Sequence, residues 1–140
     1  MRPQMTADES LARFGLVPSE EDLPKVREIL AREAEAERTG SGREDDLARL
    51  CCVQLFSHGK PEDILRIWDA KESGFDMASV VDVQFLCGGG LDATKRFLAS
   101  MPDERAAAAL SYIAECEEAG DFDEFSPETY LQGQREYFGA

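Results

Sequence analysis

Apolar positions along most of the chain recur with the period of an amphipathic α-helix. One example lies near the N-terminus, where Leu23, Val26, Ile29 and Leu30 fall on one face of a helix that Gly40 ends. Beyond Leu30 this helix is almost wholly polar. We therefore expect its second half to project into solvent or to fray.

Start and stop signals divide the chain into about eight predicted helices, at 6–14, 22–39, 41–58, 61–73, 76–87, 91–100, 102–119 and 126–138. Thr6-Ala-Asp-Glu9 and Ser41-Gly-Arg-Glu44 both have the pattern of a capping box. The stretch VVDVQFL at 80–86 has the composition of a strand, but its flanks and length favour a helix. The sequence therefore predicts an all-α protein.

Two segments thirty residues apart resemble each other, because 46–70 and 76–100 align without a gap over 25 positions. Apolar positions match across most of the alignment, and a fainter third copy follows at 108–120. The identical positions are Asp46/Asp76, Ala48/Ala78, Val53/Val83, Gln54/Gln84, Gly59/Gly89 and Arg66/Arg96. We therefore predict repeated helix pairs in which the first helix of each pair is buried on two sides.

The glycine triplet Gly88–Gly90 falls at the turn between the two helices of the second unit. A phosphate-binding loop of the GxxxxGK[ST] type needs its lysine and hydroxyl at the start of a helix that follows a strand. Here Lys95 lies inside a helix, Thr94 precedes it, and a helix leads into the glycines. We interpret the triplet as a hinge with left-handed backbone. Capture of an anion by the next helix N-terminus is the alternative.

A glutamine lies in the middle of the apolar stripe of each unit, at Gln54 and Gln84. A buried amide must find hydrogen-bond partners. Either each glutamine clamps a backbone group of a neighbouring turn, or the pair contacts a ligand. Replacing Gln84 with Leu separates the two hypotheses, since a clamp costs stability and a ligand contact costs only binding.

The paired helices and the repeated turn resemble, at the level of architecture, short helical-repeat proteins of the solenoid kind such as tetratricopeptide or HEAT arrays. The resemblance covers residues 42–138 and implies a scaffold or binding surface without naming a partner. The Trp, Gly and Tyr of the tetratricopeptide motif are not at the right places, and the ankyrin Thr-Pro-Leu-His is absent. We expect one helical domain, 1–140, with an N-terminal helical segment (1–41) and a repeat-like core (42–138). In that core, antiparallel helix pairs stack as a short right-handed solenoid or an irregular bundle.

Charge is the main compositional anomaly, because 29 acidic residues face 15 basic ones and give a net charge of -14. That balance argues against nucleic acid and anionic membranes as ligands, which need clustered Lys and Arg. A basic protein partner is compatible, and so is acidity that only maintains solubility. There is no run of ~18 apolar residues, and the start, MRPQMTADES, lacks the apolar run of a signal peptide. We therefore expect a cytoplasmic protein.

The cysteines Cys51, Cys52, Cys87 and Cys116 show no framework spacing, so we expect reduced thiols. His58, the one histidine, lies at a predicted helix C-terminus, where a protonated imidazole interacts favourably with the helix dipole. Adjacent Cys51 and Cys52 point about 100° apart on a helix, and there is no C-x-x-C pair. We expect no metal. A dyad of His58 and Cys87, if stacked turns bring them together, is the remaining catalytic alternative.

The densest acidic patch covers the end of the helix predicted at 102–119 and the loop after it, and contains no base: Glu115, Glu117, Glu118, Asp121, Asp123 and Glu124. Phe122 and Phe125 are interleaved with these acids, and Phe125 occupies the third ligand position that a calcium loop would need. One interpretation is an acidic loop whose phenylalanines pack into the core as the final helix docks. The other is an acidic surface for a basic partner, with Phe122 among the contact residues.

We expect a non-catalytic, acidic protein-binding module without a cofactor, acting as a monomer or homodimer. One concrete form is an inhibitor or immunity-type protein for a basic enzyme. This interpretation is an analogy with small, acidic, soluble proteins, and no motif supports it. Two alternatives stay open. The first is a small-ligand-binding protein or enzyme that uses the groove between helix pairs, lined by Gln54, Gln84 and Cys87. The second is a structural subunit that self-associates through the helix at 23–38.

Overall fold

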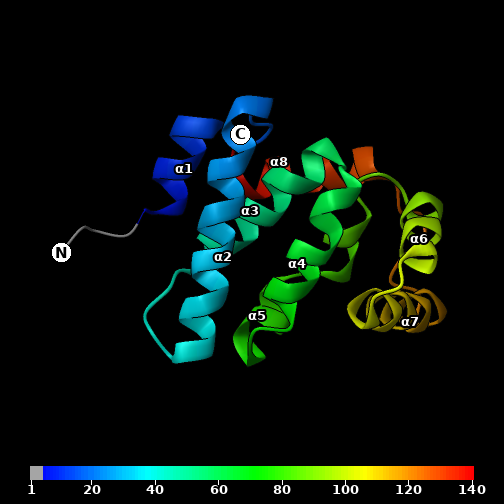
Figure 1. The fold of residues 1–140 in the computed structure, drawn as a ribbon. Helices are drawn as coiled ribbons and strands as arrows, with labels where there is room; N and C mark the ends of the chain where they lie inside the picture. Colours follow the sequence, from blue (N-terminus) through cyan, green and yellow to red (C-terminus); the bar gives the residue numbers. More distant parts are fainter. Residues whose placement is uncertain (1–4) are drawn as a thin grey trace.

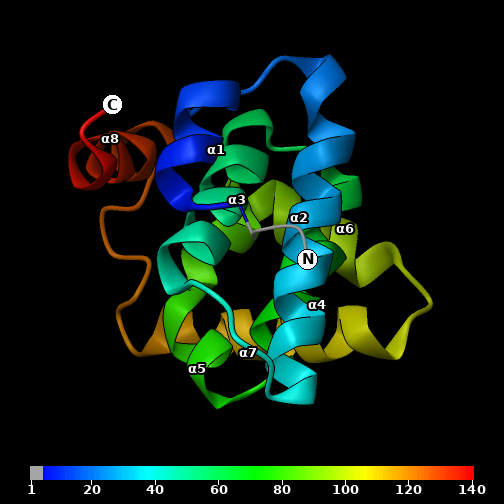
Figure 2. The same ribbon diagram turned by 90° about the vertical axis from the view of Figure 1, so that its left-hand side faces the viewer.

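The structure is a computed structural model that describes residues 5–140, so the first four residues of the predicted N-terminal segment lie outside the described part. That part is all-α, as predicted, and contains no strand. Figures 1 and 2 show its eight α-helices: α1 (Ala7–Phe14), α2 (Leu23–Thr39), α3 (Asp45–His58), α4 (Ile64–Lys71), α5 (Phe75–Val80), α6 (Leu91–Ser100), α7 (Glu104–Glu118) and α8 (Pro127–Phe138). Three short 3-10 helices, η1 (Glu20–Asp22), η2 (Pro61–Asp63) and η3 (Val83–Cys87), join them. Within residues 5–140, no helix combines the length and apolar character that a bilayer span requires.

The capping signals predicted at Thr6, Gly59 and Ser126 are confirmed, and Asp103 is a further cap that was not predicted. Thr6 and Glu9 form the reciprocal pair of a capping box at the start of α1. Side chains of Asp103 and Ser126 accept backbone N–H groups at the starts of α7 and α8. Gly59 ends α3 in the left-handed conformation, with φ of 59°. At these helix ends, local signals define the boundary without tertiary information.

The second predicted capping box is wrong, because α3 begins at Asp45 and Ser41 does not cap it. The backbone N–H of Glu44 donates instead to the carboxylate of Glu33 in α2, at 3.2 Å. Arg43 donates to Glu37, also in α2, at 2.9 Å. The loop before α3 is thus held by carboxylates of the preceding helix.

The second half of α2 is exposed on its outer side, but its inner side packs against the molecule, since α2 contacts α3, α4 and α5 (Figure 1). This corrects the prediction that this half projects into solvent or frays. Its polar residues there are structural. Glu33 is 1% exposed, and Glu37 accepts the backbone N–H of Met77 in α5 at 3.0 Å. A helix segment that looks polar in sequence packs on one side here, where its carboxylates satisfy backbone donors of other segments.

The helix predicted at 76–87 is interrupted. It forms α5 up to Val80 and resumes as η3 at Val83, with Val81 extended at φ -92° and ψ 99°. The buried ammonium of Lys71 donates to the carbonyl oxygens of Ala78 and Val81. This donor from the end of α4 satisfies carbonyls at the end of α5 and so stabilises the break.

The turns of the two repeat-like units lie against each other. Gly59 contacts Gly88 and Gly89 through backbone atoms, and the rings of Phe56 and Phe85 meet edge to face at 6.3 Å between centroids. Leu50 is buried and Val80 is half-buried, and both pack into the same core. The contact between the glycine turns is what the thirty-residue spacing predicts.

The C-terminal helix α8 returns to α3 rather than extending a row of helix pairs. Arg49 of α3 donates to the Gln134 side chain at 3.0 Å, and its guanidinium lies 3.5 Å from the centroid of the Tyr137 ring. Tyr137 in turn donates to Asp46 at 2.7 Å. These contacts dock α8 on α3.

Candidate functional site

The predicted acidic patch forms a continuous stretch over the end of α7 and the loop that leads to α8. We call the five exposed carboxylates there the acidic face: Glu115, Glu118, Asp121, Asp123 and Glu124. None of the five has a salt-bridge partner among residues 5–140. Glu117 differs from them, because it is half-buried and binds Lys95 of α6 at 2.7 Å. α7 lies on the opposite side of the molecule from α1 (Figure 1).

The loop of the acidic face has a defined backbone. Gly120 follows the end of α7 with φ of 91°, and Glu124 is the one non-glycine residue with a positive φ in the described part. Ser126 then caps α8 by accepting the backbone N–H of Thr129 at 3.1 Å. The turns at Gly120 and Glu124 and the cap at Ser126 therefore hold the carboxylates in a defined loop between α7 and α8.

Aromatic packing attaches this loop to the core, as the first interpretation of the patch predicted. Phe122 is 8% exposed and meets Phe125 edge to face, with ring centroids 5.3 Å apart. Phe125 contacts Tyr130 of α8, which in turn packs on Phe56 and Phe85 of the repeat turns. Phe122 thus supports the face from beneath, while the acidic side chains between the rings point outward.

The hydroxyl of Tyr130 donates to the carboxylate of Asp82, just before η3. Burial and this hydrogen bond raise the pKa of the Tyr130 phenol above its usual range. The tyrosine is therefore neutral at physiological pH and acts as a donor that joins α8 to the 82–87 segment.

A hollow of about 330 Å³ opens on the acidic face beside α8. Asp121, Asp123 and Glu124 line it together with the aromatic rings of Phe125 and Tyr130. The remaining lining residues are polar or small: Gln84, Ser126, Thr129, Gly133 and Gln134. No basic side chain lines the hollow, so its surface is acidic and partly aromatic.

The two predicted glutamines have different environments. Gln54 is fully buried, and its Nε2 donates to the Gly15 carbonyl at 2.9 Å and to Ser10 Oγ at 3.3 Å. Its Oε1 has no partner in the described part. Gln84 is half-buried and donates to the Asp121 carbonyl at 2.8 Å. Each glutamine thus binds a backbone carbonyl of another segment, and Gln84 also positions the loop of the acidic face.

The groove between the stacked turns is small. Its hollow measures about 110 Å³ and is lined mainly by Phe56, Gly59, Ile64, Gly88 and Phe97. The residues predicted to line it, Gln54, Gln84 and Cys87, do not do so. Pockets for small molecules typically span roughly 300–1,000 Å³, so this groove offers little room for a substrate.

All four cysteines are buried and unpaired as disulfides. Burial raises the pKa of Cys52 and of Cys87 to about 12 each, which keeps both thiols protonated. His58 lies at the end of α3 as predicted, with its Nε2 2.6 Å from the Pro18 carbonyl oxygen. Within the described residues, no group of three His, Cys, Asp or Glu side chains is arranged to hold a metal ion.

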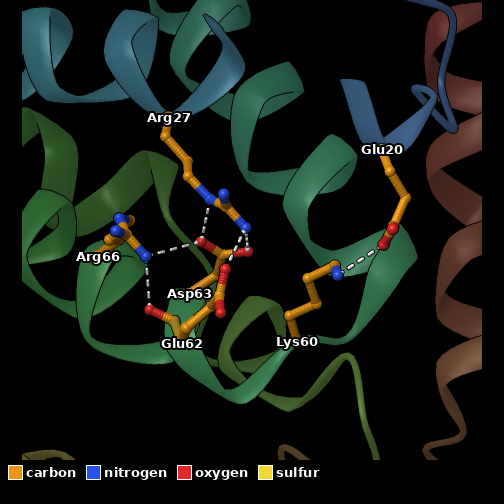
Figure 3. Close-up of polar contacts among 6 residues, drawn as sticks. All are labelled: Glu20, Arg27, Lys60, Glu62, Asp63 and Arg66. Carbon is orange, nitrogen blue, oxygen red and sulfur yellow. Dashed lines mark hydrogen bonds and ion pairs between the residues drawn. The ribbon is translucent and has the colours of Figure 1, made fainter. Parts of the chain in front are cut away.

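A buried carboxylate that the sequence analysis missed lies where α2 meets η2 (Figure 3). Asp63 is 1% exposed and accepts Nε of Arg27 at 2.8 Å and Nη1 of Arg66 at 3.2 Å. Its hydrogen bond raises the pKa of the Arg27 guanidinium. Nearby, Lys60 pairs with Glu20 at 2.6 Å. Asp63 accepts hydrogen bonds from two arginines, so it joins α2 to η2 and α4.

Comparisons with models of protein families, with curated proteins and with solved structures gave no match to this chain. The functional argument therefore rests on the geometry of the acidic face.

Proposed function

We propose that this protein is a non-catalytic binding module that docks its acidic face on a basic surface of a protein partner. The observation that carries the proposal is the set of five exposed carboxylates without ion-pair partners in the described part of the chain. Like charges held together at a surface create a local field that accelerates association with a basic partner and discriminates against acidic ones.

The support beneath the face favours binding over a purely solubilising role. The loop is attached to the core by Phe122, Phe125 and the hydrogen bond from Gln84. A fixed array of charges binds with less loss of conformational entropy than a flexible acidic segment does. An inhibitor of a basic enzyme is one form that such a module takes.

The test is capture of partners from a lysate of the source cells at about 50 mM and about 500 mM salt. The bait is the wild-type chain or the variant Glu115→Lys/Glu118→Lys, which spares the Glu117–Lys95 ion pair. A matched control, Glu21→Lys/Glu72→Lys, changes the net charge equally at exposed positions that do not belong to the face.

We expect basic proteins on the wild-type bait and on the control at low salt, and their loss at high salt and from the Glu115→Lys/Glu118→Lys bait. Equal capture by all three baits would refute the proposal. Capture lost equally from both variants would show that net charge, and not the acidic face, determines binding.

A further inference from the structure

We propose that the hollow on the acidic face receives an arginine side chain of the protein partner. This inference rests on the proposed function, because it names the chemistry by which the partner is recognised. Three independent features of the hollow lead to it: its charge and size, its aromatic walls, and an unused amide donor.

The charge and size of the hollow suit one cationic side chain. Asp121, Asp123 and Glu124 line it without any basic residue to neutralise them. Its volume of about 330 Å³ lies at the lower end of the roughly 300–1,000 Å³ of ligand pockets. The space therefore fits a long side chain better than a cofactor.

The walls favour a guanidinium over an ammonium. Phe125 and Tyr130 are both half-buried and line the hollow beside the carboxylates. A planar guanidinium stacks on aromatic rings and forms paired hydrogen bonds with a carboxylate, whereas an ammonium is a compact, strongly hydrated point charge. The chain itself contains this packing elsewhere, where the Arg49 guanidinium lies on the Tyr137 ring.

Gln134 supplies the independent indication of a peptide ligand. It is 5% exposed and lines the hollow. Its Oε1 accepts the Nε–H of Arg49, and its Nε2 has no hydrogen-bond partner among residues 5–140. Nε2 is accessible to solvent, and an accessible amide donor is complementary to a carbonyl oxygen and not to a cation. The combination of carboxylates with this donor matches an arginine together with the peptide carbonyl next to it.

Gly133 allows the hollow to be filled without changing any charge. It lies on α8, lines the hollow and is exposed. A Cβ built there meets no atom within 4 Å. The variant Gly133→Leu therefore places a side chain in open space, and Gly133→Ala is its matched control with little added volume.

The probe is a fluorescein-labelled peptide with three arginines separated by glycine and serine. Two companion peptides carry lysine, or the neutral arginine analogue citrulline, at the same positions. Fluorescence anisotropy gives the dissociation constants for the wild-type chain and the Gly133 variants. Thermal unfolding of each variant checks that it is folded.

We expect the arginine peptide to bind wild type about tenfold more tightly than either companion. Gly133→Leu should abolish this preference, and Gly133→Ala should largely keep it. The inference is overturned if the arginine peptide does not bind, if lysine or citrulline serves equally well, or if folded Gly133→Leu binds like wild type.

The variant Glu115→Lys/Glu118→Lys separates this inference from the proposed function. If it loses the basic partner while Gly133→Leu retains both partner and arginine preference, the face binds by charge and the arginine receptor is refuted. If Glu115→Lys/Glu118→Lys retains the partner, the proposed function fails, whatever the hollow binds.

Discussion

Gly59 and Gly88 lie so close that a Cβ on Gly59 would stand 2.8 Å from the carbonyl oxygen of Gly88. The two residues belong to the turns of the two repeat-like units. Their contact lets the backbones of the turns approach where any larger residue would separate them. The glycine triplet thus has a packing role that does not depend on a phosphate ligand.

Replacing Gly88 with Ala should therefore destabilise the fold. Gly88 has φ of -61°, a conformation open to any residue, so the cost is steric. Its new Cβ would lie 2.4 Å from the Phe56 carbonyl oxygen, a backbone atom that cannot rotate away. We expect a loss of about 1–3 kcal/mol in the free energy of unfolding, measured by urea denaturation.

The matched control is Gly133→Ala, at a glycine in α8 with open space around its Cβ. There the substitution improves helix propensity and should leave stability unchanged or raise it by up to about 1 kcal/mol. Equal effects at Gly88 and Gly133 would contradict the close packing of the turns.

The sequence predicted the stacked turns because the repeat places Gly59 opposite Gly89, and turn residues have strong local signals. It failed where a side chain acts on a distant backbone. The break after Val80 depends on Lys71, and the burial of α2 depends on Glu37 reaching Met77, forty residues away. Neither interaction leaves a periodic pattern in the sequence. The spacing of apolar residues alone therefore predicted one continuous helix at 76–87 and a solvated second half for the helix at 22–39.

Part of the candidate site was predictable because its signals are local in the sequence. A run of acids without bases is visible along the sequence, and the interleaved Phe122 and Phe125 indicated attachment to the core. The hollow was not predictable, because Gln84 and Gln134 reach it from segments fifty residues apart. The docking of α8 on α3, which brings Gln134 there, depends on Arg49.

Gln54 and Gln84 should differ in what their replacement by Leu costs. Gln54→Leu leaves the Gly15 carbonyl without its buried amide donor, so we expect a loss of about 1–3 kcal/mol in stability. Gln84→Leu removes an exposed hydrogen bond to Asp121 and should cost about 1 kcal/mol or less. Urea denaturation of both variants gives the comparison. A larger loss for Gln84→Leu would contradict the structural role assigned to Gln54.

The four thiols should react with a disulfide reagent only when the fold opens. Cys51 and Cys52 are fully buried, and burial raises the pKa of Cys52 to about 12. Because the thiolate is the reactive form, native protein near pH 8 should be modified slowly, while denatured protein should yield four fast-reacting thiols. Fast modification of Cys87 in the native state would contradict this expectation and would support a nucleophilic role for that thiol.

Glu37 should make stability depend on acid pH. Its pKa is lowered first by the backbone N–H of Met77 and then by the hydrogen bond from Arg43. An unfolded glutamate titrates near pH ~4.3. The stabilisation by the ionised carboxylate is therefore fully present above that value. It is lost as the pH falls through the lower folded-state pKa, since the unfolded chain takes up the proton first.

Glu37→Gln removes the charge but keeps the shape of the side chain, so we expect it to cost about 1–3 kcal/mol at pH 7. The difference from wild type should shrink as the pH falls from about 5 to about 3, because protonation removes the same charge from the wild-type chain.

Glu35→Gln is the control on the same helix. Glu35 is exposed, and its ion pair with Arg38 is long at 3.4 Å. That variant should follow the wild-type curve closely. Urea denaturation across this pH range measures all three, and a Glu37→Gln curve parallel to wild type would show that the carboxylate does not hold α5 to α2 through its charge.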